Sequence, residues 1–486
     1  MTDDLSVVMI SNRGPVSFAT RGGELEMKRG AGGLAGALDP VARRLGERAV
    51  WIAAATSDDD RRALSEGVTE DLVAELGYRL HLLDIDPDVY SQYYDDVSNR
   101  MLWFANHCLW DEIGIERFGD EELKAWSNAY KPVNERFARG ALDAADAESL
   151  VLVQDYHLTL VPSYIKRERP DQTILHFTHS SFCGPEGLER LPAPIPREVI
   201  EGMLGADLVG LHVAPWVHGF LDACEAIDAR VDRDAGAVEH NGHRSWVREY
   251  PIPIDVDDMR ARADSEEARR WAARFERDTS GPLIVRADRA EPSKNIVRGF
   301  EAFGALLDRR DDLRGKARFI ACVYPSRQSM EEYRRYAQAI EAAVQGVNER
   351  HPGSIELFLE DDFDRTLGAL SVYDVLLVNP IMDGMNLVSK EGPTVNGRDG
   401  VLVLSRGAGS FEELGDSAVR IDDSLDVHAT ADALERALEM DGDERKRLSR
   451  ALRERAAARK PGHWIEAQLA DLQAVQAGAE PESPPS

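Results

Sequence analysis

The chain has 486 residues, of which 43% are hydrophobic and 30% are charged, a composition typical of a soluble globular protein. This length exceeds one ordinary hydrophobic core and therefore predicts two domains. Acidic residues outnumber basic ones by 87 to 58, and the net charge of −29 argues against a nucleic-acid-binding surface. No apolar run approaches the length of a membrane span, and the acidic N-terminus runs directly into a strand pattern, unlike a signal peptide.

Short apolar runs alternate with helical patterns from one end of the chain to the other. Near-continuous apolar strands separated by helices predict an α/β fold with parallel sheets covered on both faces. The runs fall into two sets, which predict two doubly wound domains. The first set comprises residues 5–11, 49–54, 79–85, 150–154, 173–179 and 207–212, and the second comprises residues 283–288, 317–323, 355–360, 374–380 and 401–405.

A domain boundary is expected in REYPIPIDVD, where two prolines leave a strand and start an irregular segment. We therefore expect a first domain over residues 1–252 and a second over residues 253–460. The last helix, residues 461–476, is expected to pack back on the first domain. The tail, residues 477–486, has a composition typical of disorder.

The four cysteines, Cys108, Cys183, Cys224 and Cys322, are widely scattered. They form neither a CxxC pair nor a pattern of metal ligands. We therefore expect reduced thiols, a cytoplasmic protein and no bound metal.

Ligands of doubly wound sheets bind beyond the carboxyl ends of the strands, so residues that follow the strands are the candidates for a site. After the first strand, Arg13 precedes a turn with Gly30, Gly32 and Gly33, where backbone N–H groups can approach an anion. A tight strand-to-helix turn is the alternative for the glycines. The guanidinium beside them favours a phosphate.

Two further strands of the first half end in polar residues. Asp155 follows one strand, where it either holds a polyhydroxylated ligand or caps the helix that comes next. His179 follows the next strand and is placed for a ligand, with a structural hydrogen-bonding role as the alternative.

The second half gathers positive charge after its first two strands. Arg286, Arg289 and Lys294 lie within nine residues, ahead of a helix whose dipole adds to the charge of the lysine. Arg327 follows the next strand in the same way. Solvated surface charge is the alternative, but the clustering at strand ends in an acidic protein favours an anion site.

The segment NPIMDGMNLVSKE, residues 379–391, follows the buried run YDVLLV. Asp383 lies in the loop, Gly384 permits close approach of the backbone, and a helix is expected to begin near Met385 with free N–H groups. Glu391 lies further along that helix, where its carboxylate can accept two hydrogen bonds from a vicinal diol. These groups suit the hydroxyls, diphosphate and ribose of a sugar nucleotide. Buried capping acids are the alternative.

At these residues the chain resembles the trehalose-6-phosphate synthase family, retaining glycosyltransferases of family 20 with a GT-B fold of two Rossmann-like domains facing a central cleft. Asp383 to Glu391 match DGMNLVxKE, and Tyr93 to Trp103 match YYxxxSNxxLW. The resemblance extends in colinear order over nearly the whole chain. Other matches are SNR at 11–13, AGGL at 31–34, DYH at 155–157 and PSR at 325–327.

The resemblance implies a role for each matching position. Gly32 and Gly33 would contact the donor diphosphate, Glu391 the ribose, and Asp383 the hydroxyls of the donor sugar. The implied donor-binding positions are Gly32, Gly33, Asp383, Gly384, Met385, Asn386, Leu387, Val388 and Glu391.

On the acceptor side, Arg13, Tyr94 and Arg327 would bind the phosphate, and Trp51 and Asp155 the sugar. The implied catalytic residues are His179, near the anomeric centre, Arg289 and Lys294, on the leaving diphosphate, and Asp155.

The resemblance also implies catalysis without a protein nucleophile, a metal or another cofactor. Attack comes from the leaving-group face, so stabilisation of the departing diphosphate is the main contribution of the protein. The partners expected are a nucleotide-glucose donor and a sugar-phosphate acceptor, with neither nucleic acid nor membrane, and a homo-oligomer is possible.

Some residues depart from the family pattern. RLDYxKG reads RAEPSKN, HDYHL reads QDYHL, and HIPFP reads HSSFC at 179–183. EPSKN also resembles the validoxylamine phosphate synthase-like branch, which couples pseudo-sugars through nitrogen. Because that branch uses guanine nucleotides, GDP-glucose and UDP-glucose both remain as donors. The alternatives to glucosyl transfer to glucose 6-phosphate are pseudo-glycosyl transfer, another phosphorylated acceptor, and a silent sugar-phosphate sensor.

Overall fold

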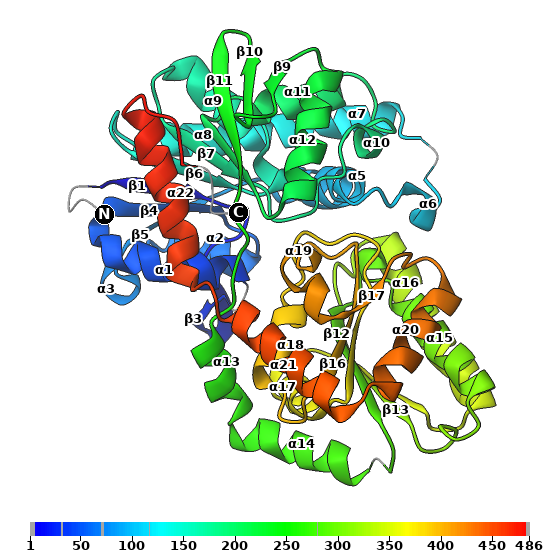
Figure 1. The fold of residues 1–486 in the computed structure, drawn as a ribbon. Coiled ribbons are helices and arrows are strands. Elements are labelled where there is room, and N and C mark those ends of the chain that lie inside the picture. The colour runs from blue at the N-terminus through cyan, green and yellow to red at the C-terminus, as the bar shows by residue number, and fades with distance from the viewer. Residues whose placement is uncertain (1–4, 31–32, 70–71, 116, 279, 483–486) are drawn as a thin grey trace. The chain divides into compact units, whose positions relative to one another are not determined.

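The computed structural model describes residues 5–30, 33–69, 72–115, 117–278 and 280–482 (Figure 1). The chain divides into two compact units. Unit 1 consists of Met1–Pro251 with Pro461–Ser486, and unit 2 consists of Ile252–Lys460. Within the described ranges, no helix combines the length and apolar character needed to cross a membrane.

Unit 1 is built on a nine-stranded sheet in the order β5-β4-β1-β6-β7-β8-β11-β10-β9. All six strand runs predicted in the first half form parallel strands of this sheet. The strands are β1 (Val7–Ile10), β4 (Ala49–Ala54), β5 (Arg79–Leu83), β6 (Leu150–Gln154), β7 (Ile174–Phe177), β8 (Leu208–Leu211), β9 (Arg230–Asp232), β10 (Ala237–His240) and β11 (His243–Glu249).

Two features of unit 1 were not predicted from the apolar pattern. Strands β9 and β10 run antiparallel at the edge of the sheet. A separate hairpin joins β2 (Val16–Arg21) to β3 (Glu24–Arg29). These strands carry many charged residues, so they lack the continuous apolar character of buried parallel strands.

Helices cover the sheet of unit 1 (Figure 1). The α-helices are α1 (Gly33–Leu45), α2 (Asp58–Ser65), α3 (Val73–Leu76), α4 (Pro87–Ser91), α5 (Trp103–Asn106), α6 (Trp110–Ile113), α7 (Asp120–Ala125), α8 (Lys131–Ala144), α9 (Val161–Glu168), α10 (Pro185–Leu188), α11 (Ile195–Met203), α12 (Ala214–Ala226) and α22 (Pro461–Gln476). The helical segments of 3-10 or π geometry are η1 (Gly46–Arg48), η2 (Gln92–Leu102), η3 (Trp126–Tyr130) and η4 (Tyr156–Leu158).

The C-terminal helix α22 is part of unit 1. Its Trp464 is buried, and the indole N–H donates to the carbonyl of Tyr250 at 2.9 Å. Beyond this helix, the N–H of Glu482 donates to Asp471 at 3.1 Å. Residues 483–486 of the expected disordered tail lie outside the described residues.

Unit 2 is built on a six-stranded, wholly parallel sheet in the order β14-β13-β12-β15-β16-β17. Alternate residues of β12 enter different cores, with Ile284 in one and Leu283 and Val285 in the other. This explains the near-continuous apolar runs, because both faces of the sheet are covered. The strands are β12 (Leu283–Arg289), β13 (Arg318–Tyr324), β14 (Ile355–Leu359), β15 (Val375–Val378), β16 (Val401–Ser405) and β17 (Val419–Ile421).

Helices lie between the strands of unit 2 along the chain, as parallel connections require. The α-helices are α13 (Val256–Ala263), α14 (Glu266–Arg277), α15 (Ile296–Arg309), α16 (Glu331–Arg350), α17 (Phe363–Val372), α18 (Val388–Val395), α19 (Phe411–Leu414), α20 (Val427–Glu439) and α21 (Gly442–Ala456). The shorter segments are η5 (Pro292–Lys294) and η6 (Gly415–Ser417).

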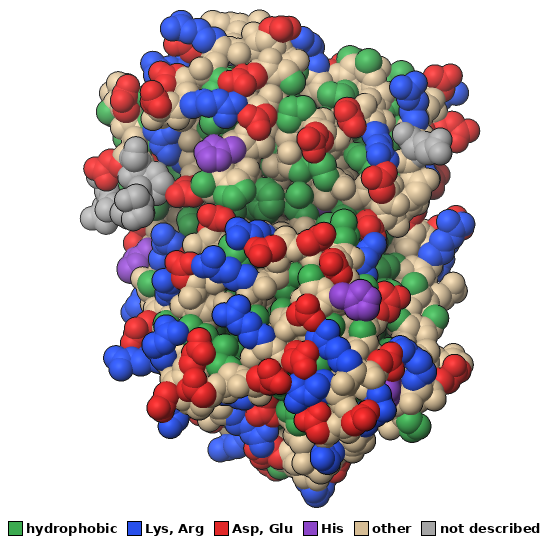
Figure 2. Space-filling model, turned by 45° about the vertical axis from the view of Figure 1, so that its right-hand side comes forward, with side chains coloured by type: hydrophobic (Ala, Val, Ile, Leu, Met, Phe, Trp, Pro, Cys, Tyr) green, Lys and Arg blue, Asp and Glu red, His purple; other side chains and the backbone are tan. Residues whose placement is uncertain are grey.

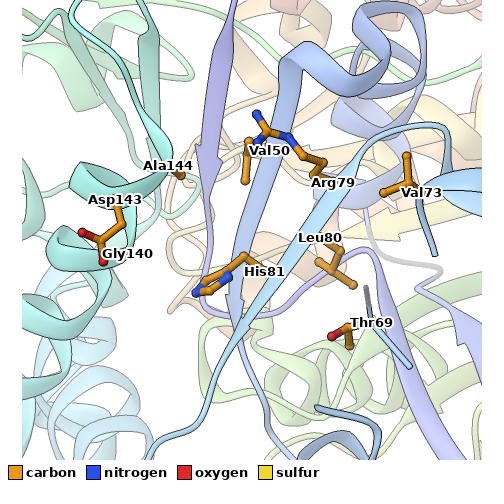
Figure 3. Close-up of a pocket in the computed structure, with 9 residues that line it drawn as sticks. All are labelled: Val50, Thr69, Val73, Arg79, Leu80, His81, Gly140, Asp143 and Ala144. Carbon is orange, nitrogen blue, oxygen red and sulfur yellow. The ribbon is translucent and has the colours of Figure 1, made fainter. Parts of the chain in front are cut away.

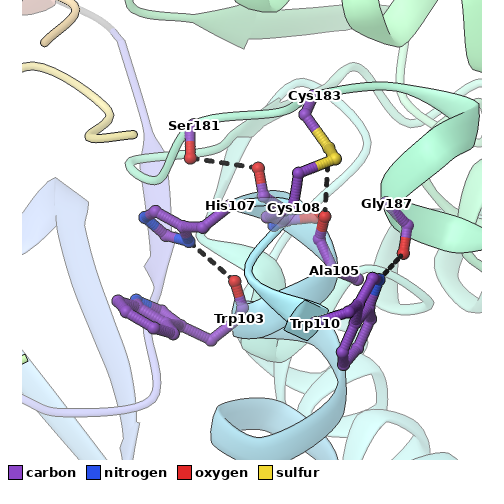
Figure 4. The surroundings of a disulfide bond; sticks show 9 residues. Trp103, Ala105, His107, Cys108, Trp110, Ser181, Cys183 and Gly187 are labelled. Atoms are coloured by element: carbon purple, nitrogen blue, oxygen red, sulfur yellow. Dashed lines mark hydrogen bonds between the residues drawn. A yellow bond between two sulfur atoms is a disulfide. The ribbon is translucent and has the colours of Figure 1, made fainter. Parts of the chain in front are cut away.

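The expectation that all cysteines are reduced is wrong for two of them. Cys108 and Cys183 form a disulfide, although 75 residues separate them in the sequence (Figure 4). The bond joins the turn after α5 to the loop that follows His179. Cys224 and Cys322 are free and buried.

Candidate active site

Asp155 lies at the carboxyl end of β6 with a φ of 74°, a backbone region that few residues other than glycine adopt. Its carboxylate accepts the backbone N–H of His179 at 3.1 Å and lies 3.6 Å from Nδ1 of His157. It makes no capping hydrogen bond to the helical turn that follows, so the capping alternative is wrong. Burial alone would raise the pKa of Asp155, but His157 and His179 hold it below its ordinary value.

His179 lies beyond the end of β7, the strand paired with β6. Its Nε2 lies 2.9 Å from Oε1 of Gln154, the last residue of β6. With Nε2 donating to Gln154, the other ring nitrogen is left as the acceptor of the neutral imidazole. Burial lowers the pKa of His179, which favours this neutral form.

Arg13 and Tyr94 come together, as the sequence predicted from two separate motifs. The guanidinium donates to the hydroxyl of Tyr94 at 3.1 Å, and its carbon lies 5.5 Å from the ring centre. The Tyr94 ring also stacks on His157, the neighbour of Asp155. An exposed arginine therefore lies on the same side of unit 1 as Asp155, held by an aromatic ring.

The expected contact of Trp51 with a sugar is corrected. Trp51 lies within β4 with only 1% of its surface exposed, and its indole N–H donates to Oγ of Ser11 at 2.8 Å. The side chain is part of the core and presents no surface to a ligand. Of the two diphosphate glycines, Gly33 is the first residue of α1, whereas Gly32 lies outside the described residues.

In unit 2, the cationic residues follow β12. The side chain of Arg289 is 46% exposed, and Nζ of Lys294 lies 2.5 Å from the carboxylate of Asp383. Arg286 instead is fully buried and pairs with Asp288 at 2.8 Å, so it belongs to the core rather than to an anion site. Two of the three clustered cations therefore remain at the strand end.

The loop after β15 holds Asp383 and Asn386 together, with the Asn386 amide donating to the carboxylate at 3.0 Å. Asn386 has a φ of 70°, and its Oδ1 accepts the N–H of Ser389. The expected helix therefore begins at Val388, not near Met385, because the left-handed backbone at Asn386 interrupts helical geometry. Among the described residues we find no acceptor for the N–H groups of Asn386, Leu387 and Val388, which leaves them available to an anion.

Glu391 lies in the first turn of α18, and in the described ranges no hydrogen bond or ion pair to its carboxylate is found. Burial raises its pKa to about 7. Its neighbour Lys390 is more deeply buried and is paired, since Nζ donates to the carbonyl of Ile252 at 3.0 Å and contacts the carboxylate of Glu413. A desolvated carboxylate with no partner among the described residues is typical of a group that awaits a ligand.

Arg327 follows β13 with a φ of 43° and a side chain that is 11% exposed. Its guanidinium donates to the hydroxyl of Tyr333 and lies 3.4 Å from the carboxylate of Glu291. Two residues with positive φ, Arg327 and Asn386, thus lie in the segments that follow β13 and β15, the strands on either side of β12, and such strained residues are common at functional sites.

Sequence reasoning singled out most of these residues but missed four that hold them. Gln154 was noted only as a departure from a family motif. His157 and Lys390 were noted only as members of the DYH and DGMNLVxKE motifs, and Glu291 only within the RAEPSKN segment, because the contacts through which they act are made by folding. These residues are Gln154, His157, Glu291 and Lys390.

The remaining surface offers weaker candidates. A cavity of about 350 Å³ lies in unit 1 beside Val50, Arg79, His81, Gly140 and Asp143 (Figure 3). Val50 and Arg79 are at the amino ends of their strands, opposite the site residues. Figure 2 shows acidic and basic side chains interspersed over the visible face. The described residues contain no group of His, Cys, Asp or Glu able to hold a metal ion.

Comparison with known proteins decides the family. Residues 5–474 match the family described as Glycosyltransferase family 20. The chain belongs to glycosyltransferase family 20. The chain is a trehalose-6-phosphate synthase-like glycosyltransferase.

Relatives of the chain include two enzymes with different activities. A trehalose-6-phosphate synthase of Mycobacterium sp. (strain KMS) is 32% identical over 98% of this chain and 97% of its own length. A validamine 7-phosphate valienyltransferase of Streptomyces hygroscopicus is 31% identical over 88% of this chain and 86% of its own.

A solved structure supports the fold. The crystal structure of a UDP-forming α,α-trehalose-phosphate synthase from Burkholderia vietnamiensis matches with a TM-score of 0.80 and 25% identity, covering 98% of both chains. The predicted α/β GT-B architecture is thereby confirmed.

Proposed function

We propose that the protein is a retaining glucosyltransferase that forms trehalose 6-phosphate from a nucleotide glucose and glucose 6-phosphate. The observation that carries the proposal is the complete set of anion- and diol-binding groups after β12 and β15. Arg289 and Lys294 supply positive charge, and within the part of the chain that the structure describes three backbone N–H groups have no acceptor and the Glu391 carboxylate has no partner. A silent sensor would have no need of the leaving-group cations.

In this reaction the bond between C1 of glucose and the β-phosphate oxygen breaks, and the acceptor hydroxyl oxygen bonds to C1 from the same face. The proton of that hydroxyl passes to a phosphate oxygen of the leaving group. Arg289 and Lys294 stabilise the charge that develops on the diphosphate. Asp383, now paired with Lys294, shares its carboxylate with the hydroxyls of the donor sugar.

On the acceptor side, we assign the phosphate to Arg13 and Tyr94 of unit 1, and Asp155 accepts hydrogen bonds from the sugar hydroxyls. The low pKa of Asp155 keeps it ionised and thus an acceptor only. Neutral His179 lies beside it, near the transferred glucose. The contact between Nε2 of His179 and Oε1 of Gln154 keeps the imidazole ring oriented. It adds no charge near C1 of the glucose.

The nucleotide of the donor is GDP or UDP in this proposal. Transfer of a pseudo-sugar is the second candidate function. The similarity to a validamine 7-phosphate valienyltransferase and the RAEPSKN segment favour that candidate. The intact DGMNLVSKE segment is retained under either reaction, so it does not separate them.

The test is a turnover screen of the full chain. Glucose 6-phosphate is combined with UDP-, GDP- and ADP-glucose, and both nucleoside diphosphate and disaccharide phosphate are measured. We expect disaccharide phosphate with one of the first two donors. Tight binding of GDP without turnover on any donor refutes glucosyl transfer, and product from GDP-valienol and validamine 7-phosphate would establish the second candidate.

A further inference from the structure

Glu291 is a buried carboxylate that no step of the proposed reaction uses. It lies two residues beyond the end of β12, immediately before η5, and its side chain is 1% exposed. Its Oε1 accepts the hydroxyl of Ser326 at 3.1 Å and lies 3.4 Å from both Nε of Arg289 and Nη1 of Arg327. Burial alone would raise the pKa of Glu291, but the neighbouring cations lower it to about 2.

The two arginines that share this oxygen have different expected ligands. Arg289 belongs to the donor diphosphate and Arg327 to the acceptor phosphate. They follow adjacent strands, since β12 and β13 pair in parallel with Arg289 opposite Tyr324. A single carboxylate thus sets the separation between a leaving-group cation and an acceptor-binding cation.

We propose that Glu291 is a positioning residue that holds Arg289 and Arg327 in the geometry that brings donor and acceptor phosphates together. The proposal rests on the proposed function for the identity of the two phosphates. The connection between the two arginines rests on geometry, because two positive charges this close repel each other unless an anion lies between them. Arg327 also requires a stabilising contact such as the one with Glu291, because its backbone is in the left-handed region.

A role of Glu291 in neutralising charge and a role in positioning the arginines predict opposite effects of removing its carboxylate. If Glu291 only neutralised charge, its loss would leave a more positive site, and phosphates would bind more tightly. If it positions the arginines, its loss weakens acceptor binding and slows transfer, since a displacement of about 1 Å can cost about 100-fold in rate.

A matched control exists in the same unit. Glu356, on β14, also bridges two arginines, with Arg274 at 2.5 Å and Arg318 at 3.2 Å. Arg318 is the first residue of β13, so this bridge lies at the amino end of the sheet, away from the site. Glu356→Gln removes the same chemical group without touching the expected ligands.

The experiment compares Glu291→Gln, Glu291→Asp and Glu356→Gln with the unmodified chain by steady-state kinetics and thermal unfolding. For Glu291→Gln we expect KM for the sugar phosphate to rise and kcat to fall, each by about 10-fold or more. Glu291→Asp keeps the charge and should recover part of the loss. Glu356→Gln should lower thermal stability. Because the substitution is distant from the site, KM and kcat should stay within about 2-fold of the values for the unmodified chain.

A fall in KM for Glu291→Gln, or kinetics that match those of Glu356→Gln, would overturn the proposal. If Glu291→Gln does not fold, Glu291→Asp decides the matter, because the shorter side chain must still change the split between KM and kcat. If the unmodified chain shows no turnover, the proposed function fails separately. The positioning role is then judged by calorimetry with GDP, UDP and glucose 6-phosphate, for which Glu291→Gln must lose affinity on both sides.

Discussion

Replacing Glu391 by glutamine should make the ligand-free protein more stable at alkaline pH. The side chain is only partly exposed, its carboxylate has no partner among the described residues, and desolvation raises its pKa to about 7, above the ordinary value of 4.5. This difference corresponds to about 3 kcal/mol of cost to the folded state when the group is ionised. Glutamine keeps the shape and removes the charge, so Glu391→Gln avoids most of that cost.

The pH dependence follows from the sign of the shift. Below pH 4.5 the carboxyl is protonated in both folded and unfolded chains, and the cost is absent. Between pH 4.5 and 7 the folded chain binds more protons than the unfolded one, so the stability of the unmodified protein falls as pH rises. Above pH 7 the full cost is present, and the advantage of the variant should level off at up to about 3 kcal/mol.

Urea unfolding of both proteins at several pH values between 4.5 and 8.5 measures this advantage, followed through the fluorescence of Trp271, the one tryptophan in the sequence of unit 2. Glu356→Gln serves as the control, because that carboxylate is paired with arginines and its removal should destabilise the protein. The same Glu391→Gln variant should bind nucleoside diphosphate more weakly if the ribose lies there. An equal or lower stability of Glu391→Gln at pH 8 would show that the carboxylate has a partner or is well hydrated, and would refute the reasoning.

Three further predictions concern other contacts. Arg289→Ala should lower kcat by about 100-fold with little change in acceptor affinity, by analogy with the loss of one donor to a developing anion, and unchanged single-turnover rates would remove Arg289 from the reaction. Lys390→Met should destabilise the protein by about 3 kcal/mol, because it leaves the carboxylate of Glu413 with fewer cations, and adding Glu413→Gln should restore part of the loss in urea unfolding. Dithiothreitol should lower the Tm of the unmodified chain, because it reduces the disulfide that closes the 75-residue loop between Cys108 and Cys183 and that stabilises the fold by at most about 4 kcal/mol. A variant with both cysteines replaced by serine should show no response to the reductant.

Repeating apolar runs were enough to predict the architecture. All eleven predicted strands are present as parallel strands, because a strand covered on both faces must be apolar at nearly every position. Charged edge strands such as β9 and β10 escaped the same reasoning, since they are stabilised by pairing rather than by burial of their side chains. The DGMNLVSKE segment could also be proposed as donor-binding from the sequence, because Asp383 and Glu391 lie close together in the chain, in one turn and the helix that follows it.

Residues distant in sequence required the tertiary structure. Trp51 looked like a ligand contact, but burial within β4 and a hydrogen bond to Ser11 place it in the core. The pairing of Cys108 with Cys183 depends on a loop meeting a helix end, which spacing alone does not reveal.

The sequence by itself thus determined the fold class, the family and the chemistry offered at the strand ends, because these depend on local patterns of apolar and polar residues. Only the tertiary structure decided which groups are paired and which are free. Glu291 is buried between two arginines, whereas Glu391 is partly exposed and has no partner among the described residues. The two glutamates have the same side chain, and the difference arises entirely from the strands and loops that folding brings around each one.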